Sequence, residues 1–349
     1  MAIPEVDVAI EWQAAHAEKA GAPCTGRIVR SERAMMQTAT EVGRRIREWE
    51  GLTLEAAMPL RIAGGIHHLF LTGDAPELAA VYAGEVTDQD AVDRIVVGLV
   101  ERFDARLSPW LDGPPQTNEA GRSASIMAGL LWLSRRLGPR FELNEIGASA
   151  GVNTMMERYF YDLGGVEVGP ADSPMRIAPK WRGGLPLAGK VEIVSIRGSD
   201  IAPVDLADPA QALRLKAYVW ADAKERMQRI DAAIRLASEK RPDLVEQDAG
   251  AFVAELVERP QAAGVTRVLY HSVMWQYLPV ATRDAIAKLM EAAGQAATPD
   301  RPLAWIRLET NRETFAHELT VKYWPGSSRE WTQLTQAHPH GAWVEWVGQ

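Results

Sequence analysis

An acid followed by alternating small residues is the feature of the sequence that most clearly suggests chemistry. Glu145 ends an apolar, strand-like segment, and Gly147, Ser149 and Gly151 follow it at alternate positions. Small residues in a turn between a strand and a helix let the backbone approach a ligand closely, and the amides that begin the helix favour polar or anionic groups. Because ligands bind at the carboxyl ends of strands in open α/β sheets, we expect these four residues to bind a ligand. The alternative is a turn whose small residues serve packing alone.

The same turn also fits G-x-S-x-G, the nucleophile elbow of α/β-hydrolases, with Ser149 as the nucleophile. Candidate acids and histidines follow in the order that a catalytic triad needs: Asp200, Asp248, His338 and His340. That fold places several strands before its elbow, whereas the sequence before residue 140 predicts helices. Glu145 would also put a carboxylate beside a developing oxyanion. Hydrolysis at Ser149 therefore remains an alternative function.

A segment rich in glycine and proline separates this turn from the next strand-end acid, Asp200. Between residues 164 and 189, ten of the 26 residues are Gly or Pro, too many for a regular helix or a central strand. We expect an insertion here, a loop or hairpin that crosses the site. Once it is set aside, Asp200 lies close to the distance at which nucleotide-binding turns have their ribose-binding acid, about 20 residues.

A second group of candidate catalytic residues follows a predicted buried strand near residue 270. His271 could act as a base or contact substrate, because an imidazole titrates near neutral pH. The alternative is a core histidine bonded to the backbone. Tyr277 is a second catalytic candidate, and Trp275 would give the pocket an aromatic wall. We predict no metal site, because the pair of His338 and His340 has no clustered carboxylates or cysteines.

The elements that would position these residues change in character along the chain. Residues 1–137 predict mostly helices, whereas strand-like and helical segments alternate from residue 138 to 349. The predicted strands are 141–146, 191–196, 244–246, 266–270, 303–308, 318–323 and 343–347, and the predicted helices are 152–159, 209–236, 249–258 and 282–293. This alternation predicts an α/β fold with a mostly parallel sheet covered by helices on both faces. We expect the last two strands to form an antiparallel pair at its edge, and residues 1–137 to form a helical cap domain.

In order and spacing, the second half resembles class I S-adenosylmethionine-dependent methyltransferases. The Glu145–Gly151 turn resembles their first motif, with Ser149 in place of the middle glycine, and Asp200 resembles the strand-end acid that holds the ribose hydroxyls. Asp248 resembles the acid that meets the adenine amino group, and residues 268–277 occupy the position of the fourth strand. The resemblance implies a Rossmann-like sheet, S-adenosylmethionine as cofactor, and methyl transfer to a small molecule or a protein side chain. A non-catalytic cofactor-binding module is the further alternative.

The whole chain also resembles a bacterial family known as domain of unknown function 2332. The shared features are Gln116-Thr-Asn118-Glu119 with Arg122, the Glu145–Gly151 turn, Arg197-Gly-Ser-Asp200, His271-Ser-Val with Trp275-Gln-Tyr277, Trp324-Pro-Gly and His338-Pro-His340-Gly. This resemblance implies a fold and no particular reaction.

Four residues are predicted to serve the substrate: Asn118, Arg122, Arg197 and Trp275. Asn118 can cap a helix that runs to residue 137, and helical spacing places it on one face with Arg122, which could close over the cofactor. We expect the pocket to be walled by the cap, the 164–189 insertion and the 271–277 turn. The two arginines would favour an acceptor with a carboxylate or phosphate. The alternative is that both arginines pair with nearby acids.

Composition excludes several other classes of function. The net charge is −8 and no long basic run occurs, which argues against nucleic acid or an anionic membrane as the main partner. Cys24 is the single cysteine, so no internal disulfide can form. No apolar stretch approaches the ~20 residues of a membrane helix, and Glu5 and Asp7 lie where a signal peptide would be basic. We therefore expect a soluble, cytoplasmic protein with a small-molecule substrate, and the sequence predicts neither the methyl acceptor nor the oligomeric state.

Overall fold

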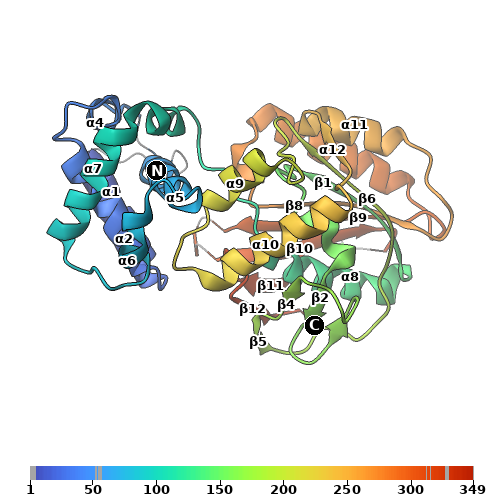
Figure 1. The fold of residues 1–349 in the computed structure, drawn as a ribbon. Helices are drawn as coiled ribbons and strands as arrows, with labels where there is room; N and C mark the ends of the chain where they lie inside the picture. Colours follow the sequence, from blue (N-terminus) through green and yellow to red (C-terminus); the bar gives the residue numbers. More distant parts are fainter. Residues whose placement is uncertain are drawn as a thin grey trace. The chain divides into compact units, whose positions relative to one another are not determined.

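The computed structural model describes residues 5–51, 53, 57–311, 313–314, 316–326 and 330–348. The chain divides into two compact units, which are shown in Figure 1. Unit 1 comprises Met1–Thr117 and Asp208–Asp231, and unit 2 comprises Asn118–Ala207 and Ala232–Gln349. No helix in the described part of the chain is both long and apolar enough to cross a membrane.

Unit 1 is built from helices around an apolar core. Its helices are α1 (Val6–Lys19), α2 (Pro23–Arg30), α3 (Glu32–Met35), α4 (Glu41–Arg47), α5 (Met58–Leu71), α6 (Ala79–Tyr82), α7 (Gln89–Leu107) and α9 (Pro209–Ala217), with the first turns of α10 (Lys224–Glu239). Side chains such as Ile10, Ile28, Ile62 and Val96 form one buried cluster. Each such side chain contributes roughly 1.5–3 kcal/mol by leaving water.

Residues 32–50 of the predicted helical cap and the helix predicted at 209–236 each divide into two shorter helices. The run 32–50 divides into α3 and α4, because Thr38 and Thr40 bond locally: the Thr38 hydroxyl donates to the Met35 carbonyl, and the Thr40 hydroxyl accepts from the Gly43 amide. The run 209–236 divides into α9 and α10. Between them, the Asp222 carboxylate accepts hydrogen bonds from the start of α2, a long-range contact that no local pattern predicts.

The described residues of unit 2 form a nine-stranded sheet in the order β5-β12-β11-β10-β9-β8-β1-β6-β7. The strands are β1 (Arg140–Ile146), β5 (Lys180–Gly183), β6 (Glu192–Asp200), β7 (Leu244–Glu246), β8 (Thr266–Ser272), β9 (Leu303–Thr310), β10 (His317–Trp324), β11 (Thr332–Ala337) and β12 (Trp343–Trp346). The strands from β7 to β9 are parallel, β9 to β12 are antiparallel, and β5 joins β12 in parallel. This is a mixed α/β unit with a mostly parallel sheet.

The five parallel strands have a different order in the sheet than along the chain. Chain order runs β1, β6, β7, β8, β9, whereas spatial order runs β7, β6, β1, β8, β9. The chain therefore builds outward from β1 in one direction and then, from β8 onward, in the other. Ligands of open α/β sheets bind outside the carboxyl ends of the strands at such a reversal.

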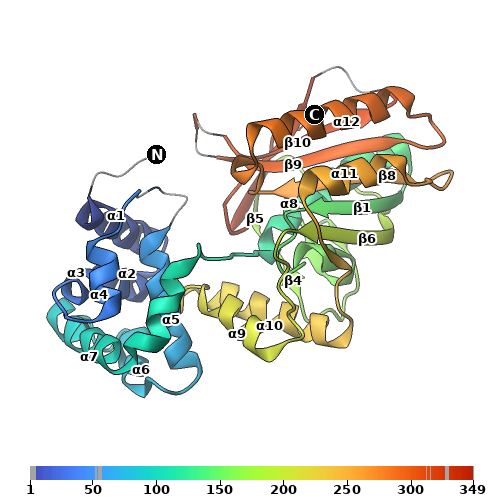
Figure 2. The same ribbon diagram turned by 90° about the horizontal axis from the view of Figure 1, so that it is seen from above.

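Helices cover both faces of this sheet (Figure 2). On one face lie α11 (Ala249–Glu258) and α12 (Val280–Ala296), whose apolar residues pack with Leu303 and Trp305 of β9. On the other face lies α8 (Ser123–Leu137), where Gly129 is close to Leu319 and Ile306. The sequence placed α8 in the helical cap, but it groups with the sheet because its buried side covers β9 to β11.

The last part of the sheet differs from the predicted antiparallel pair. The strand β11 lies between β10 and β12, so the predicted terminal strands do not pair with each other, and β5 forms the edge. The 164–189 insertion contains β3 (Glu167–Val168) and β4 (Arg176–Ile177), which pair with β2 (Phe160–Asp162), and then β5. Its last residue, Gly189, lies against Ser134 of α8. The strand β2, with which β3 and β4 pair, also contacts this helix, since the Tyr161 hydroxyl donates to Ser123.

Candidate functional site

The turn after β1 is held by the end of the neighbouring strand β6. The Ser149 amide donates to Oδ2 of Asp200 at 2.8 Å, and the Ala148 amide donates to the Ser199 carbonyl at 2.9 Å. Oδ1 of Asp200 accepts from the Ala202 amide at 2.9 Å. Each carboxylate oxygen can accept more than one hydrogen bond, so Asp200 orders the turn and keeps acceptor capacity.

Backbone conformation and packing both explain the glycines of this turn. Gly147 and Gly151 have φ of 66° and 69°, a region that L side chains rarely adopt. A Cβ on Gly147 would lie 2.8 Å from the Met274 side chain, and one on Gly151 would lie 2.8 Å from the Thr154 hydroxyl. The protein's own side chains therefore fill the space beside both glycines. Ser149 adopts φ of 53° without being a glycine, which marks a strained position.

Glu145 at the end of β1 is almost completely buried, with 1% of its surface exposed. Burial raises the pKa of its carboxyl well above the ordinary value, and the Asp200 charge adds to this, whereas a hydrogen bond from Tyr270 at 3.2 Å and the Arg122 charge oppose it. Asn153 lies beside the carboxyl. Its amide oxygen and nitrogen are both buried and make no hydrogen bond of ordinary geometry within the described residues.

Arg122 lies inside unit 2 and close to Glu145. It is 8% exposed, and its Nε donates to the Pro339 carbonyl at 3.0 Å. The positive charge of Arg122 acts to lower the pKa values of both Glu145 and His317. Burial is the main cause that lowers the pKa of His317 to about 4, and the Arg122 charge adds to it. The structure therefore brings Arg122 to the carboxyl edge of β1, as the predicted substrate role requires.

Asn118 reaches the same turn by a contact that the sequence did not predict. Its Oδ1 accepts a hydrogen bond from the Val152 amide at 2.7 Å. It does not cap the following helix, because Glu119 accepts the Gly121 amide there and a 3₁₀ turn (Ala120–Arg122) precedes α8. The helix predicted for residues 152–159 is also a 3₁₀ helix, Asn153–Arg158.

Asp248 occupies the carboxyl end of β7 and caps α11. Its Oδ1 accepts from the Gly250 and Ala251 amides at 2.8 and 3.2 Å. Glu145, Asp200 and Asp248 thus follow three neighbouring parallel strands, β1, β6 and β7, at the same edge of the sheet. This is the placement on which the predicted cofactor site depends.

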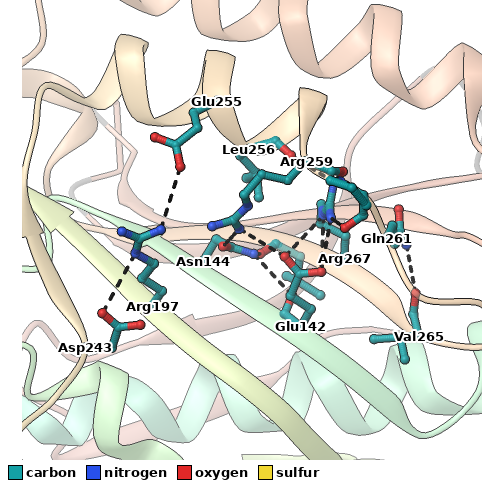
Figure 3. Close-up of polar contacts among 12 residues, drawn as sticks. Glu142, Asn144, Arg197, Asp243, Glu255, Leu256, Arg259, Gln261, Val265 and Arg267 are labelled. Carbon is teal, nitrogen blue, oxygen red and sulfur yellow. Dashed lines mark hydrogen bonds and ion pairs between the residues drawn. The ribbon is translucent and has the colours of Figure 1, made fainter.

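Arg197 lies away from this edge. Its guanidinium is 3.7 Å from Glu255 of α11 and 3.8 Å from Asp243, as Figure 3 shows. It belongs to a set of charged and polar contacts beneath α11, and the structure does not bring it to Glu145. Arg197 therefore pairs with nearby acids, as the alternative interpretation of the two arginines expected.

His271 is fully buried and bonded to a carboxylate that the sequence analysis missed. Its Nδ1 is 2.6 Å from Oε1 of Glu309, which also accepts the Met274 and Trp275 amides at 3.2 and 3.3 Å. Burial lowers the pKa of His271. Burial alone would raise the pKa of Glu309, but hydrogen bonds from His271 and the two amides hold it below the ordinary value. A neutral imidazole therefore donates from Nδ1 to an ionised Glu309, and Nε2 has no hydrogen-bond partner in the described part.

His271 and Glu145 face opposite sides of the sheet. Glu145 pairs in register with Tyr270, and adjacent residues of a strand point to opposite faces. The Arg122 charge acts on Glu145, whereas His271 lies on the α12 side and stacks on Trp275, so one pocket shared by Arg122 and His271 stays a prediction.

The two aromatic candidates after β8 differ in their surroundings. Trp275 stacks on His271 with ring centroids 4.9 Å apart. Tyr277 is 61% exposed, and no hydrogen bond between described residues orients its hydroxyl. The 164–189 insertion contacts α8 through Gly189 and pairs with β12 through β5, and its role as a pocket wall stays a prediction. In the part of the chain that the structure covers, no three His, Cys, Asp or Glu side chains gather to hold a metal ion.

Comparison with known proteins identifies a family. The sequence model of the family described as "Uncharacterized protein conserved in bacteria", domain of unknown function 2332, matches residues 8–346. The chain belongs to this family. No curated protein and no solved structure matches it. The family description names no activity, so the function must be argued from the site.

Several polar residues at the sheet edge escaped the sequence analysis. Tyr270 and Asn153 contact or adjoin Glu145, and Glu309 holds His271. One signal was present for the last of these: Trp305 and Arg307 alternate along the predicted strand 303–308, and Glu309 directly after it continues the alternation, which places all three on one face. Charged residues at the end of an otherwise apolar strand are unusual enough to deserve a functional hypothesis.

Proposed function

We propose that unit 2 binds S-adenosylmethionine and transfers its methyl group to an acceptor. One observation carries the proposal: Glu145, Asp200 and Asp248 lie at the carboxyl ends of three neighbouring parallel strands, and the first of these strands, β1, is where the strand order reverses. A Rossmann-like methyltransferase fold for this unit belongs to the same proposal. The five parallel strands have the order in which such sheets are wound, and the antiparallel strands follow on one side.

The residues at the edge suit the groups of this cofactor. In the proposal, Asp200 accepts from the ribose hydroxyls and Asp248 from the adenine amino group. Glu145, which would lose its proton on binding, suits an ammonium, and the neighbouring Arg122 guanidinium suits a carboxylate. The Ser149 hydroxyl is buried and makes no hydrogen bond among the described residues, and the Asn153 amide is buried beside Glu145. Buried polar atoms usually have a partner in the functional state.

The cofactor supplies an electrophilic methyl carbon, so the protein's main task is alignment of donor and acceptor. Asp200 and Asn118 hold the turn by accepting hydrogen bonds from its Ser149 and Val152 amides. His271 remains the candidate base, because Glu309 fixes Nδ1 as the donor and leaves Nε2 to accept a proton. Trp275 covers the imidazole, so this role requires its indole to move. Tyr277 has no role in the proposal, because nothing orients its hydroxyl.

Calorimetry with S-adenosylmethionine and S-adenosylhomocysteine tests the proposal. Asp200→Asn keeps the shape of the side chain and removes its charge, so binding should weaken by about tenfold or more. Asp243→Asn is the matched control, because Asp243 precedes the neighbouring strand and faces Arg197. The proposal fails if the folded wild-type protein binds neither compound, or if both variants bind as the wild type does.

Hydrolysis at Ser149 is the second candidate, and one observation favours it. Ser149 has a strained φ of 53°, as the nucleophile of a strand-to-helix elbow would, and its hydroxyl has no hydrogen-bond partner among the described residues. The same observation counts against it, since no imidazole bonds that hydroxyl. Labelling by a fluorophosphonate probe that Ser149→Ala abolishes would place hydrolysis first.

A further inference from the structure

A guanidinium surrounded by indole rings lies on the α12 face of the sheet, at the carboxyl end of β9. Arg307 lies over Trp275, Trp305 and Trp331, with its central carbon 5.5, 5.8 and 4.6 Å from the three ring centroids. The rings also contact each other: Trp305 meets Trp275 and Trp331 edge-on, at 5.5 and 5.0 Å. We call these four residues the Arg307 cluster.

The polar groups of the Arg307 cluster are unsatisfied. Arg307 makes no hydrogen bond and no ion pair with any described residue, and its Nε is buried. The indole nitrogen of Trp305 is a second buried donor with no acceptor. Glu309 is the nearest opposing charge that acts on Arg307, but its Oε1 already accepts from His271 and two backbone amides. A guanidinium keeps its charge in proteins, so the cluster presents a cation whose N–H groups have no acceptor among the described residues.

Arg267 shows how this unit treats a buried arginine with a purely structural role. Its guanidinium donates to both oxygens of Glu142 and to the carbonyls of Leu256, Arg259 and Pro260 (Figure 3). Buried polar groups are nearly always paired in this way, and an exception calls for an explanation. Arg307 lies two strands from β1 in the same sheet and has none of these partners.

The rings around Arg307 also restrict what could pair with it. Trp275, Trp331 and Arg307 are all partly exposed, so the cluster is in contact with solvent. A carboxylate matches the planar fork of a guanidinium and can accept from an indole N–H as well. A flat aromatic body stacks well on indole and guanidinium faces, whereas the highly hydrated phosphate of a sugar would leave the rings without a partner.

We propose that the Arg307 cluster binds an aromatic carboxylate, with the carboxylate on Arg307 and the ring against Trp275 and Trp331. Because the cluster adjoins His271 and the end of β8, this ligand is the methyl acceptor if the proposed function holds. Only the role of this ligand as methyl acceptor rests on the proposed function. The binding site itself can be tested without any cofactor.

The test compares acids with their uncharged amides on the full chain. Benzoate, phenylacetate and indole-3-acetate are titrated by calorimetry, beside benzamide, phenylacetamide, indole-3-acetamide and the non-aromatic cyclohexanecarboxylate. We expect at least one aryl acid to bind about tenfold or more tightly than its amide and than cyclohexanecarboxylate. Equal binding of acid and amide by the wild type, or no binding of any aryl acid, overturns the inference.

Two variants locate the binding. Arg307→Met should lose the preference for acid over amide, and Arg182→Met should keep it. Arg182 is the matched control, because its guanidinium lies over Trp343, 4.6 Å from the ring centroid, on the edge strand β5. An unchanged preference in Arg307→Met would overturn the inference. If that variant does not fold, the comparison of acid and amide in the wild type decides instead.

The outcome separates this inference from the proposed function. Binding of S-adenosylmethionine without binding of any aryl acid refutes the acceptor class and leaves methyl transfer standing. Binding of aryl acids without S-adenosylmethionine refutes methyl transfer and keeps the Arg307 cluster as a ligand site.

Discussion

Replacing Glu32 by glutamine should remove a pH-dependent loss of stability from unit 1. Glu32 begins α3, has no exposed surface, and neither of its carboxyl oxygens has a hydrogen-bond partner among the described residues. Burial raises the pKa of this carboxyl well above the ordinary value of 4.5. The folded protein therefore keeps Glu32 protonated at pH values where the unfolded chain has lost the proton.

The direction of the effect follows from proton binding. Above pH 4.5 the unfolded state binds fewer protons at this site than the folded state, so the free energy of unfolding falls as the pH rises. The fall continues until the pH passes the raised pKa of Glu32. Within that interval the slope approaches about 1.4 kcal/mol per pH unit, so two pH units produce a difference of about 2.7 kcal/mol from Glu32→Gln.

Urea unfolding of both proteins at a series of pH values measures this difference. Hydrogen exchange of α7, which packs on α3, provides a readout confined to unit 1. All other titrating groups are common to the two proteins, so their contributions cancel. Glu50→Gln is the control, because Glu50 is exposed and its loss should change stability by less than about 0.5 kcal/mol at every pH. Parallel stability curves for wild type and Glu32→Gln would refute the reasoning.

Three further predictions concern unit 2. Arg267→Met should cost about 3–5 kcal/mol of unfolding free energy, since it removes one of the two arginines that pair with Glu142 and leaves three carbonyls without their donor, whereas Arg235→Met should cost less than about 0.5 kcal/mol because its ion pair is mostly exposed. Thermal unfolding checks both, and equal losses would contradict the argument. A cation that binds beside Glu145 should displace a proton, because the pKa of this carboxyl is raised, so cation binding should tighten as the pH rises. Calorimetry in buffers of different ionisation enthalpy should then give different binding heats. Identical heats would show that no proton is released. Asn118→Ala should lower stability by about 1 kcal/mol through the lost bond to the β1 turn, and an unchanged melting temperature would show that this bond is dispensable.

Local sequence patterns determined where the parallel strands begin and which acids end them. Apolar runs that end in Glu145 or lead to Asp200 and Asp248 predict strand, turn and edge position together, because carboxyl ends of parallel strands meet on one side. The patterns failed where a strand is polar. Thr332–Ala337 and Lys180–Gly183 lack regular apolar alternation and form strands because neighbours pair with their backbones.

Only the tertiary structure decided which polar groups meet. Arg122 and Arg197 both lie near predicted motifs, yet one reaches Glu145 and the other pairs with Glu255 and Asp243. Glu309 and Arg307 became candidates because the sheet places them beside His271 and three indoles. The physical reason is range: helix and strand periods depend on residues a few positions apart, whereas a charged side chain finds its partner across strands that are far apart in the chain.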